Sequence, residues 1–290
     1  MPTLSNPGKV VTALFFSIAA AFGAEEVALR SLVETEKNFA ATSVERGIRE
    51  SFLQFFADDS IIFAPEPKNG KRFYTDYQDK GRKLSWRPIF ATIARSGELG
   101  VTTGPWELAK SKAEPAPIAY GDFLSIWRKQ SDGSWKVIVD VGVDHERPRD
   151  LPAETKLQPP AELPANVDFD LARAALEKAE KILAEAVKEG AGKGILTAAS
   201  DDIRVLRQNS FPAVGRDAAS AMLSSDNGKM TRENSGGGVS VACDLVYRYG
   251  SYSAERGNAT ERGYYLTIWR MENGDWKIIV DLQKKAADHQ

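Results

Sequence analysis

The sequence predicts an α+β protein built from two tandem cone-shaped domains, each a curved antiparallel sheet covered by about three N-terminal helices. Three observations lead to this prediction. A residue pattern recurs near the end of each half, a proline-rich segment separates the halves, and helical periodicity precedes strand periodicity in both. A chain of 290 residues is long enough for two domains with separate cores.

Two segments that share a residue pattern predict a β-hairpin at the end of each half. The first covers residues 121–140 and the second covers residues 263–281, and each contains two tryptophans at matching places. In both, apolar residues on either side of a short polar turn indicate two paired strands. A weaker match upstream predicts another strand in each half, and Gly104 and Gly250 are expected to mark a turn or bulge between two strands.

Helical periodicity predicts the N-terminal part of each half. In the first half, apolar residues recur at helical spacing over residues 29–40 and again over residues 48–56. In the second half they recur over residues 171–187. A third helix is expected after Gly70 and after Gly215. Helices that come first, with strands later, favour a helical layer on one face of each sheet.

A proline-rich segment lies between the two halves. Prolines recur between residues 146 and 167, where they disfavour helices and sheet pairing and favour an extended connector. The predicted domains are therefore residues 25–145 and residues 168–284, joined by a linker over residues 146–167. Residues 285–290 are expected to form a short tail.

The first 24 residues are typical of a secretory signal peptide. Lys9 precedes an apolar run from Val10 to Ala24, and small residues end that run. Because the run is shorter than the roughly 20 residues that span a bilayer, we expect export to the periplasm or the extracellular space, without membrane association after cleavage. Cleavage is expected after Ala21 or after Ala24, and an uncleaved membrane anchor is the alternative.

Composition excludes several classes of partner. The chain has 38 Lys and Arg against 40 Asp and Glu, with no basic block that could follow a phosphate backbone, so we expect no nucleic-acid partner. The sequence contains no phosphate-binding glycine loop and no Cys/His cluster with metal-ligand spacing, so we expect no cofactor and no metal. The single cysteine, Cys243, is expected to be buried and inert within a strand.

The first half resembles a known family. Its Trp86-Arg-Pro88 element, its Thr-Thr-Gly-Pro-Trp-Glu segment at 102–107 and its terminal hairpin are similar to SnoaL-like domains, catalogued as domain of unknown function 4440. That family belongs to the nuclear transport factor 2-like superfamily. The resemblance spans residues 26–145, whereas the second half shares mainly the last hairpin. It implies a cone with a pocket at its open end, in a superfamily that includes isomerases, polyketide cyclases, dehydratases and non-catalytic binding modules.

Carboxylates and aromatic residues on the predicted strands are the candidate site residues. The resemblance implies a base beside an apolar substrate, and Glu107 and Glu98 are the candidates for that base. Glu107 follows Trp106, whose ring can raise the pKa of a neighbouring carboxyl by desolvation. Trp106, Tyr247 and Tyr249 are the predicted ligand-binding residues. The alternative for both carboxylates is a solvated face or an ion pair with a nearby Lys or Arg.

Four other polar residues are expected to lie outside a pocket. His145 lies at the edge of the linker, and His289 is next to the C-terminus. Asp140 and Asp281 are expected to end the last strand of each half, where Asp usually serves in turns.

Three functions remain open from the sequence, and only one of them requires no ligand. The leading hypothesis is an exported module that binds a small apolar molecule in the pocket of the first half. The second is an isomerase- or cyclase-like lyase that uses a pocket carboxylate. The third is a structural pseudodimer whose two sheets pack together, with self-association through sheet faces. Whether the protein is an enzyme is left open.

Overall fold

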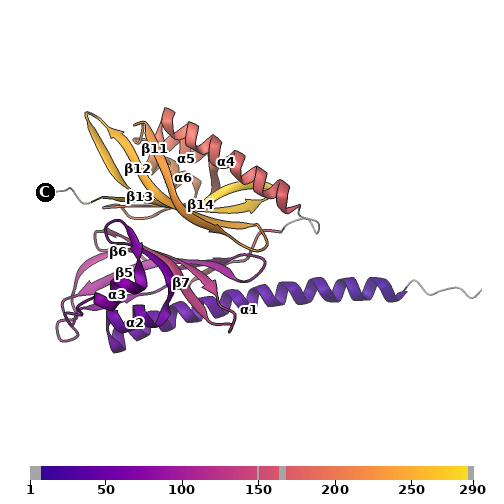
Figure 1. Cartoon of the computed structure of the whole chain (residues 1–290), viewed down its shortest axis with the longest axis horizontal. Helices are drawn as coiled ribbons and strands as arrows, with labels where there is room; N and C mark the ends of the chain where they lie inside the picture. The colour runs from indigo at the N-terminus through magenta and orange to yellow at the C-terminus, as the bar shows by residue number, and fades with distance from the viewer. Residues whose placement is uncertain (1–7, 149, 163–167, 287–290) are drawn as a thin grey trace, which may run out of the picture.

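The computed structural model describes residues 8–148, 150–162 and 168–286, with side chains from residue 23 onward. It contains two domains, one above the other in Figure 1, and each has its own sheet and its own helices. Domain 1 runs from α1 to β8, and domain 2 runs from α4 to β14. The predicted α+β fold class with two tandem domains is confirmed.

Domain 1 begins with helices and continues as a sheet. Its helices are α1 (Gly8–Arg46), α2 (Ile48–Phe55) and α3 (Gly70–Asp76). Its strands are β1 (Phe56–Phe63), β2 (Pro67–Asn69), β3 (Lys83–Trp86), β4 (Phe90–Ile93), β5 (Leu99–Ala109), β6 (Pro117–Lys129), β7 (Trp135–His145) and β8 (Lys156–Gln158). Within the described residues they form one sheet in the order β2-β1-β7-β6-β5-β4-β8, and β3 pairs with β5 beside this path.

Domain 2 repeats this plan with fewer strands. Its helices are α4 (Phe169–Glu189), α5 (Ala191–Ala198) and α6 (Arg216–Leu223). Its strands are β9 (Ala199–Arg207), β10 (Ala213–Val214), β11 (Met230–Val239), β12 (Leu245–Arg256), β13 (Ala259–Glu272) and β14 (Asp275–Lys285). They form a second sheet in the order β10-β9-β14-β13-β12-β11. The two predicted hairpins, β6–β7 and β13–β14, therefore belong to separate sheets.

Most neighbouring strands are antiparallel, as predicted, but three pairs are parallel. These are β1 with β7, β4 with β8, and β9 with β14. Two parallel neighbouring strands need a long connection between them. In each domain the other strands of the sheet form the connection between the first long strand and the last. Strand β8 lies inside the predicted linker, between Pro152 and Pro159. Its residues retain the backbone N–H groups that pairing needs, and the Lys156 N–H donates to the Ile89 carbonyl at 2.9 Å.

Two local predictions about the strands are wrong. Gly104 and Gly250 lie inside β5 and β12, not at turns between strands, although the register of β11 shifts between Asn234 and Gly236, opposite Gly250. A Cβ atom at Gly104 would lie 3.0 Å from the backbone nitrogen of Ile89, so glycine here allows a close approach of two backbones. Cys243 lies in the turn between β11 and β12 and not in a strand, although it is buried as expected.

The N-terminal helix continues through both expected cleavage points. Helix α1 is unbroken from Gly8 to Arg46. Residues 1–7 of the predicted signal peptide lie outside the described residues, as do 163–167 of the linker and 287–290 of the tail. Across the described part of the chain, no helix has the length and apolar character needed to cross a membrane.

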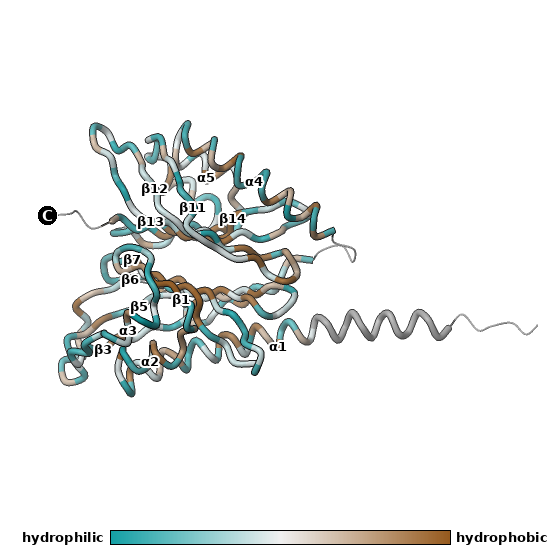
Figure 2. The backbone as a smooth tube through the Cα atoms, viewed as in Figure 1, coloured by the Kyte–Doolittle hydropathy of each residue, from teal (hydrophilic) through white to brown (hydrophobic). Residues whose placement is uncertain are grey.

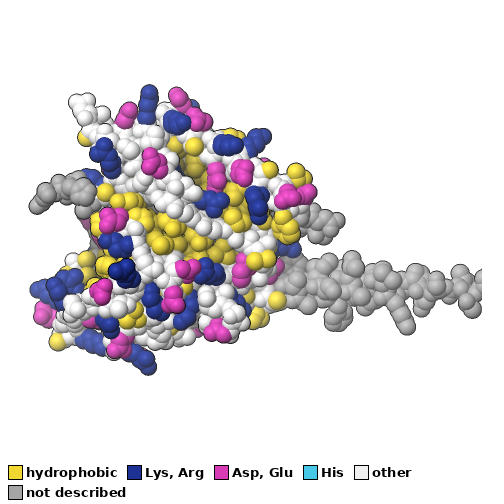
Figure 3. Space-filling view, viewed as in Figure 1, with side chains coloured by type: hydrophobic (Ala, Val, Ile, Leu, Met, Phe, Trp, Pro, Cys, Tyr) yellow, Lys and Arg dark blue, Asp and Glu magenta, His cyan; other side chains and the backbone are white. Residues whose placement is uncertain are grey.

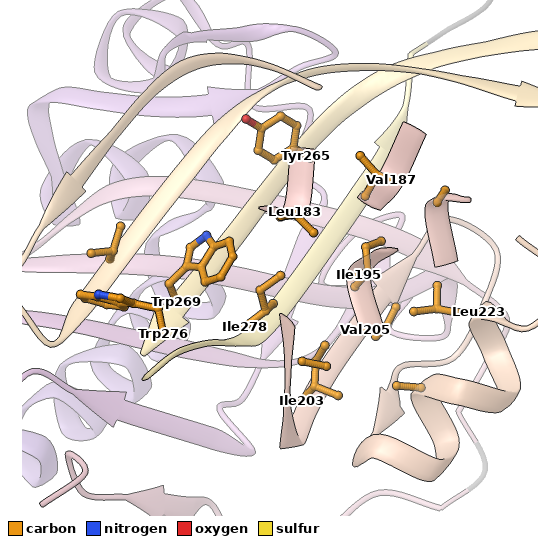
Figure 4. Close-up of a cluster of buried hydrophobic side chains, with 14 of the residues drawn as sticks. Leu183, Val187, Ile195, Ile203, Val205, Leu223, Tyr265, Trp269, Trp276 and Ile278 are labelled. Carbon is orange, nitrogen blue, oxygen red and sulfur yellow. The ribbon is translucent and has the colours of Figure 1, made fainter. Parts of the chain in front are cut away.

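Each sheet has an inner face, which packs against the helices of its own domain. In domain 2, Leu183 of α4 lies beside Trp269, and Ile195 of α5 lies beside Val205 (Figure 4). The four tryptophans of the repeated hairpins are at most 4% exposed, and they are Trp127, Trp135, Trp269 and Trp276. Their recurrence thus reflects core packing.

Each sheet also has an outer face, and the outer faces of the two sheets pack against each other. Their apolar side chains form one cluster that includes Leu124, Ile126, Val139 and Val141 of domain 1 and Leu266, Ile268, Val280 and Leu282 of domain 2. Figure 2 shows the hydrophobic stretches of the two sheets facing each other, and in Figure 3 apolar side chains follow the junction on the visible face. Burial of this apolar surface stabilises the pairing of the two domains.

Polar contacts fix the register of the two domains. The backbone N–H of Arg95 donates to Oδ2 of Asp244 at 2.9 Å. The backbone N–H of Asn209 donates to the carbonyl oxygen of Asp144 at 2.7 Å. The sheet-against-sheet arrangement expected of a pseudodimer is therefore built within one chain.

Candidate functional site

Strand alternation separates the predicted residues of β5. Side chains of successive residues point to opposite faces of a strand, and Trp106 and Leu108 line a cavity at the inner face of domain 1. Glu107, between them, is exposed and does not line that cavity. Its Oε1 accepts a hydrogen bond from Oγ of Ser85 at 3.2 Å.

The other three predicted site residues lie at the junction of the domains. Glu98 accepts a hydrogen bond from the backbone N–H of Val241 at 2.7 Å. Tyr247 and Tyr249 of β12 pack against the apolar cluster between the sheets, and the ring of Tyr249 lies 6.0 Å from that of Phe63. Both tyrosines point to the outer face of their sheet, so the structure gives them an interdomain contact in place of the expected pocket.

The cavity at the inner face of domain 1 has a volume of about 270 Å³. Its wall is largely aromatic and includes Phe52, Tyr74, Tyr77, Trp86, Trp106 and Phe123. Of the predicted ligand-binding residues, Trp106 is the one that lines it. An apolar wall of this size suits a small molecule with few polar groups.

Two glycines make room for the indole ring of Trp106. A Cβ atom at Gly121 would lie 2.5 Å from that ring, and a Cβ atom at Gly142 would lie 3.2 Å from its Nε1. The ring can therefore lie across β6 and β7 and form part of the cavity wall. Gly121 is also the first residue of the repeated hairpin pattern, so this glycine of the motif is the one that makes room for the Trp106 ring in the cavity wall.

A carboxyl group lies in this aromatic wall. Asp140 of β7 lines the cavity, and its Oδ2 accepts a hydrogen bond from Oγ of Ser125 at 2.7 Å. Burial raises the pKa of Asp140 to about 6, although the Ser125 hydrogen bond and the charge of Lys284 act in the opposite direction. A carboxyl with this pKa can both accept and release a proton near neutral pH.

The expected turn role of Asp140 and Asp281 is wrong. Strand β7 continues to His145 and β14 continues to Lys285, so both aspartates lie inside strands. The strands continue because the apolar residues after each aspartate pack into the cluster between the sheets. Both aspartates consequently point to the inner face of their domain.

A second buried carboxyl group lies behind the cavity. Glu36 of α1 has no exposed surface. It accepts hydrogen bonds from Nε1 of Trp86 at 2.6 Å, from Oγ1 of Thr102 at 2.6 Å and from Nε1 of Trp127 at 3.0 Å. Burial raises the pKa of Glu36 to about 7 against the effect of these donors, and the charge of Asp140 adds to the rise.

The sequence carries a signal for Glu36 that apolar periodicity alone does not include. Glu36 falls at helical spacing among Leu32, Val33, Phe39 and Ala40, which are all buried. A charged residue on an otherwise apolar helical stripe must be paired or neutral. Asp140 carried the weaker signal of recurring at the same place in both hairpins.

Solved structures that are similar to this chain each match about two fifths of it. A protein of unknown function from Shewanella oneidensis is 13% identical, with a TM-score of 0.33, over 38% of this chain and 97% of that one. One from Pseudomonas putida is 17% identical, with a TM-score of 0.34, over 42% of this chain and 97% of that one. Both are described as nuclear transport factor 2-like. LinA is 16% identical, with a TM-score of 0.34, over 41% of this chain and 92% of that one.

In each domain a curved sheet closes around its helices, as the sequence resemblance implied. The chain matches no protein-family model and no curated protein.

His145 is the last residue of β7 in domain 1. Its Nε2 lies 2.6 Å from Oδ2 of Asp122, and its ring lies 4.9 Å from that of Phe211 in domain 2. Burial opposes the charged ring, but the hydrogen bonds to Asp122 and to the Glu146 carbonyl outweigh it and raise the pKa of His145. The ring is on the outer face, away from the cavity, as expected, and His289 lies outside the described residues.

The inner face of domain 2 holds a smaller cavity of about 150 Å³. Asp281, at the place equivalent to Asp140, accepts a hydrogen bond from Thr267 at 3.0 Å. It also forms ion pairs with Arg207 at 2.7 Å and with Arg232 at 2.8 Å. Burial alone would raise the pKa of Asp281, but the two guanidinium groups lower it below its usual value.

The second carboxylate of domain 2 is also paired with an arginine. Glu180 of α4 lies 2.8 Å from Nε of Arg248, and both line the small cavity. Across the described residues, no three His, Cys, Asp or Glu side chains are grouped to hold a metal ion.

Proposed function

We propose that domain 1 is an acid–base catalyst that binds a small, largely apolar carbonyl compound and moves a proton at the carbon next to the carbonyl group. The observation that carries this proposal is a carboxyl group with a pKa of about 6, Asp140, in the wall of an aromatic cavity of about 270 Å³. Asp140 thus takes the role of the pocket carboxylate of an isomerase or lyase, for which Glu107 and Glu98 were the sequence candidates.

The surroundings of Asp140 suit proton transfer. Ser125 donates to one carboxyl oxygen and orients the group, so the other oxygen can face a substrate. Burial raises the pKa of Tyr74 well above its usual value, so its hydroxyl stays protonated in the same cavity. Aromatic side chains hold the apolar part of a substrate and keep water from the reacting carbon.

The experiment is a hydrogen-exchange assay on a simple enolisable ketone. The probe is 2-tetralone in heavy water, and NMR follows the loss of its signals from the protons next to the carbonyl. Removal of a general base lowers such rates by about 100-fold or more, so Asp140→Asn should abolish the exchange that the wild-type protein catalyses.

The matched control is Glu107→Gln, which removes an exposed carboxylate outside the cavity. It should exchange protons as fast as the wild type. Exchange that survives in Asp140→Asn, or that is lost in Glu107→Gln, would overturn the proposal.

A second candidate function is binding of a small apolar molecule without chemistry. It is favoured by the aromatic wall itself, to which the neighbouring strands β5 and β6 contribute Trp106 and Phe123. In that case 2-tetralone should bind and protect the tryptophans from a fluorescence quencher, while its protons exchange no faster than in buffer. The two functions differ only in the exchange rate, so one sample distinguishes them.

We also propose that the protein is exported to the periplasm or the extracellular space. The support is the positively charged start, the short apolar run and the small residues that precede Glu25. Sequencing the N-terminus of the protein recovered outside the cytoplasm should give Phe22 or Glu25 as the first residue. Recovery only in the cytoplasm, with Met1 or Pro2 first, would contradict export.

A further inference from the structure

A lysine of domain 2 reaches the cavity of domain 1. Lys284 lies near the end of β14, on the outer face with Val280 and Leu282, which pack between the sheets. Its Nζ donates to the carbonyl oxygen of Gly142 in β7 at 2.8 Å. Lys284 therefore lines the same cavity as Asp140, although the two residues belong to different domains.

The ammonium group of Lys284 is placed to bind a negatively charged oxygen. An ammonium group has three N–H donors, and Gly142 accepts from one of them. Burial lowers the pKa of Lys284, while the carboxyl groups of Asp144 and Asp140 oppose that change. The other cation that lines the cavity, Arg82, is exposed. Lys284 is thus the enclosed positive charge on the wall that also carries the base.

We infer that Lys284 binds the oxygen on which negative charge develops when Asp140 removes a proton, so that domain 2 completes the site of domain 1. This inference rests on the proposed function and specifies its substrate class, a small enolisable ketone. The Asp140 carboxylate takes the proton from the carbon next to the carbonyl. The C–H electron pair forms a carbon–carbon double bond, and the carbonyl π pair moves to the oxygen beside Lys284. Return of the proton from Asp140 to the same carbon regenerates the carboxylate and completes a hydrogen exchange. In a β,γ-unsaturated ketone the enolate is a dienolate, and return of the proton to its γ-carbon completes an isomerisation.

The contribution runs in one direction only. In the repeated hairpins Asp140 corresponds to Asp281, so the residue of domain 1 that corresponds to Lys284 is Val143. Val143 is apolar and packs in the cluster between the sheets. Domain 1 therefore returns no cation to domain 2 at this position. This asymmetry accounts for two unequal domains in one chain, one with the base and one with the lysine.

The test compares two probes of similar shape and different charge. They are 4-nitrophenol, at a pH where the free phenol is ionised, and nitrobenzene, which stays neutral. Isothermal titration calorimetry should show that the wild type prefers the phenolate. Lys284→Met removes a charged hydrogen-bond donor, so it should weaken binding of the phenolate by about 10- to 100-fold. Binding of nitrobenzene, which carries no charge, should not change.

Three further variants keep the test informative. Lys284→Arg retains the charge and should keep most of the phenolate preference. Lys285→Met changes the exposed neighbouring lysine and should behave as the wild type does. Asp140→Asn removes the negative charge of the wall and should strengthen phenolate binding, opposite in sign to Lys284→Met. Thermal unfolding of each variant shows that it is folded.

Two outcomes would overturn the inference. One is that Lys284→Met weakens the binding of both probes equally, which would mean that Lys284 only links the domains. The other is failure of the folded wild type to bind either probe, which would mean that the cavity does not accept an aromatic oxyanion. Failure of the proposed function looks different: proton exchange would persist in Asp140→Asn while the phenolate preference still depended on Lys284.

Discussion

The two domains place carboxyl groups at matching positions of their inner faces and neutralise them in different ways. Asp140 of domain 1 corresponds to Asp281 of domain 2 through the repeated hairpin. Glu36 and Glu180 correspond because each lies four residues after a buried leucine of the first helix, Leu32 or Leu176. In domain 1 the partners are hydroxyl and indole groups, and the pKa values rise to about 7 and about 6. In domain 2 the partners include arginines, and the pKa of Asp281 falls.

The difference results from a few substitutions at equivalent strand positions. Thr102, which donates to Glu36, corresponds to Arg248, which pairs with Glu180. Trp86, which pairs with Trp106 of the neighbouring strand, corresponds to Arg232, which pairs with Tyr252. A neutral donor leaves a buried carboxyl able to exchange its proton, whereas an arginine keeps it ionised. The same fold thus provides a proton-transfer site in domain 1 and a fixed charge network in domain 2.

The largest effect is expected when the network of domain 2 loses an arginine. Arg232→Met leaves Asp281 enclosed with one ion-pair partner, and removal of one partner of a buried pair costs about 3–5 kcal/mol. Urea unfolding should show a fall of this size in the free energy of unfolding. The double variant Arg232→Met with Asp281→Asn should recover much of it. Unchanged stability of the single variant would contradict the network described for domain 2.

The next effect is a gain in stability when domain 1 loses its aspartate. The pKa of Asp140 is about 6 in the folded protein and about 3.9 in an unfolded chain. Folding therefore loses stability as the pH rises through this window, because the folded state resists ionisation. Asp140→Asn should raise the free energy of unfolding at neutral pH by about 3 kcal/mol, and the gain should vanish below the lower pKa.

The matched control for that prediction is Asp281→Asn. The pKa of Asp281 is lowered, so its charge stabilises the folded state at neutral pH, and the variant should be less stable there. The comparison between the domains fails if both asparagine variants change stability in the same direction. Urea unfolding across the acid and neutral range measures both.

A smaller, spectroscopic effect should report on Glu36. Its carboxyl group accepts from the indole nitrogens of Trp86 and Trp127, so ionisation changes the field at both rings. Tryptophan fluorescence should show a transition centred at about pH 7, the pKa of Glu36. Glu36→Gln should remove the transition, and Glu180→Gln should leave it in place. A transition that persists in Glu36→Gln would assign it to another group.

The smallest effect is expected at the junction of the domains. The pKa of His145 is raised in the folded protein, so its contribution to stability is full below the ordinary histidine pKa and is lost as the pH rises through the raised value. His145→Gln should remove this part of the pH dependence from thermal unfolding. An unchanged pH profile would mean that the Asp122 pair does not couple to folding.

Periodicity was enough to predict the helical layer, the paired hairpins and the division into two domains, because each depends on residues close together in the chain. Periodicity was a weaker guide to which side chains line the cavity. Trp106 lines a cavity, but its neighbour Glu107 points to the opposite face, as strand alternation requires. Tyr247 and Tyr249 lie on the outer face of the domain 2 sheet, and the sheet of domain 1 covers that face. The alternation of residues along β12 alone would leave this face open.

The sequence by itself determined two helix-then-strand domains, since the spacing of apolar residues and glycines dictates local conformation. Only the tertiary structure decided which carboxyl groups are enclosed and what faces them. Burial is a property of the packed chain, and it raises the pKa of Asp140 only where β7 lies under the helices of its own domain. Lys284 lies far along the chain from Asp140, and packing of the two outer faces brings it to the same cavity.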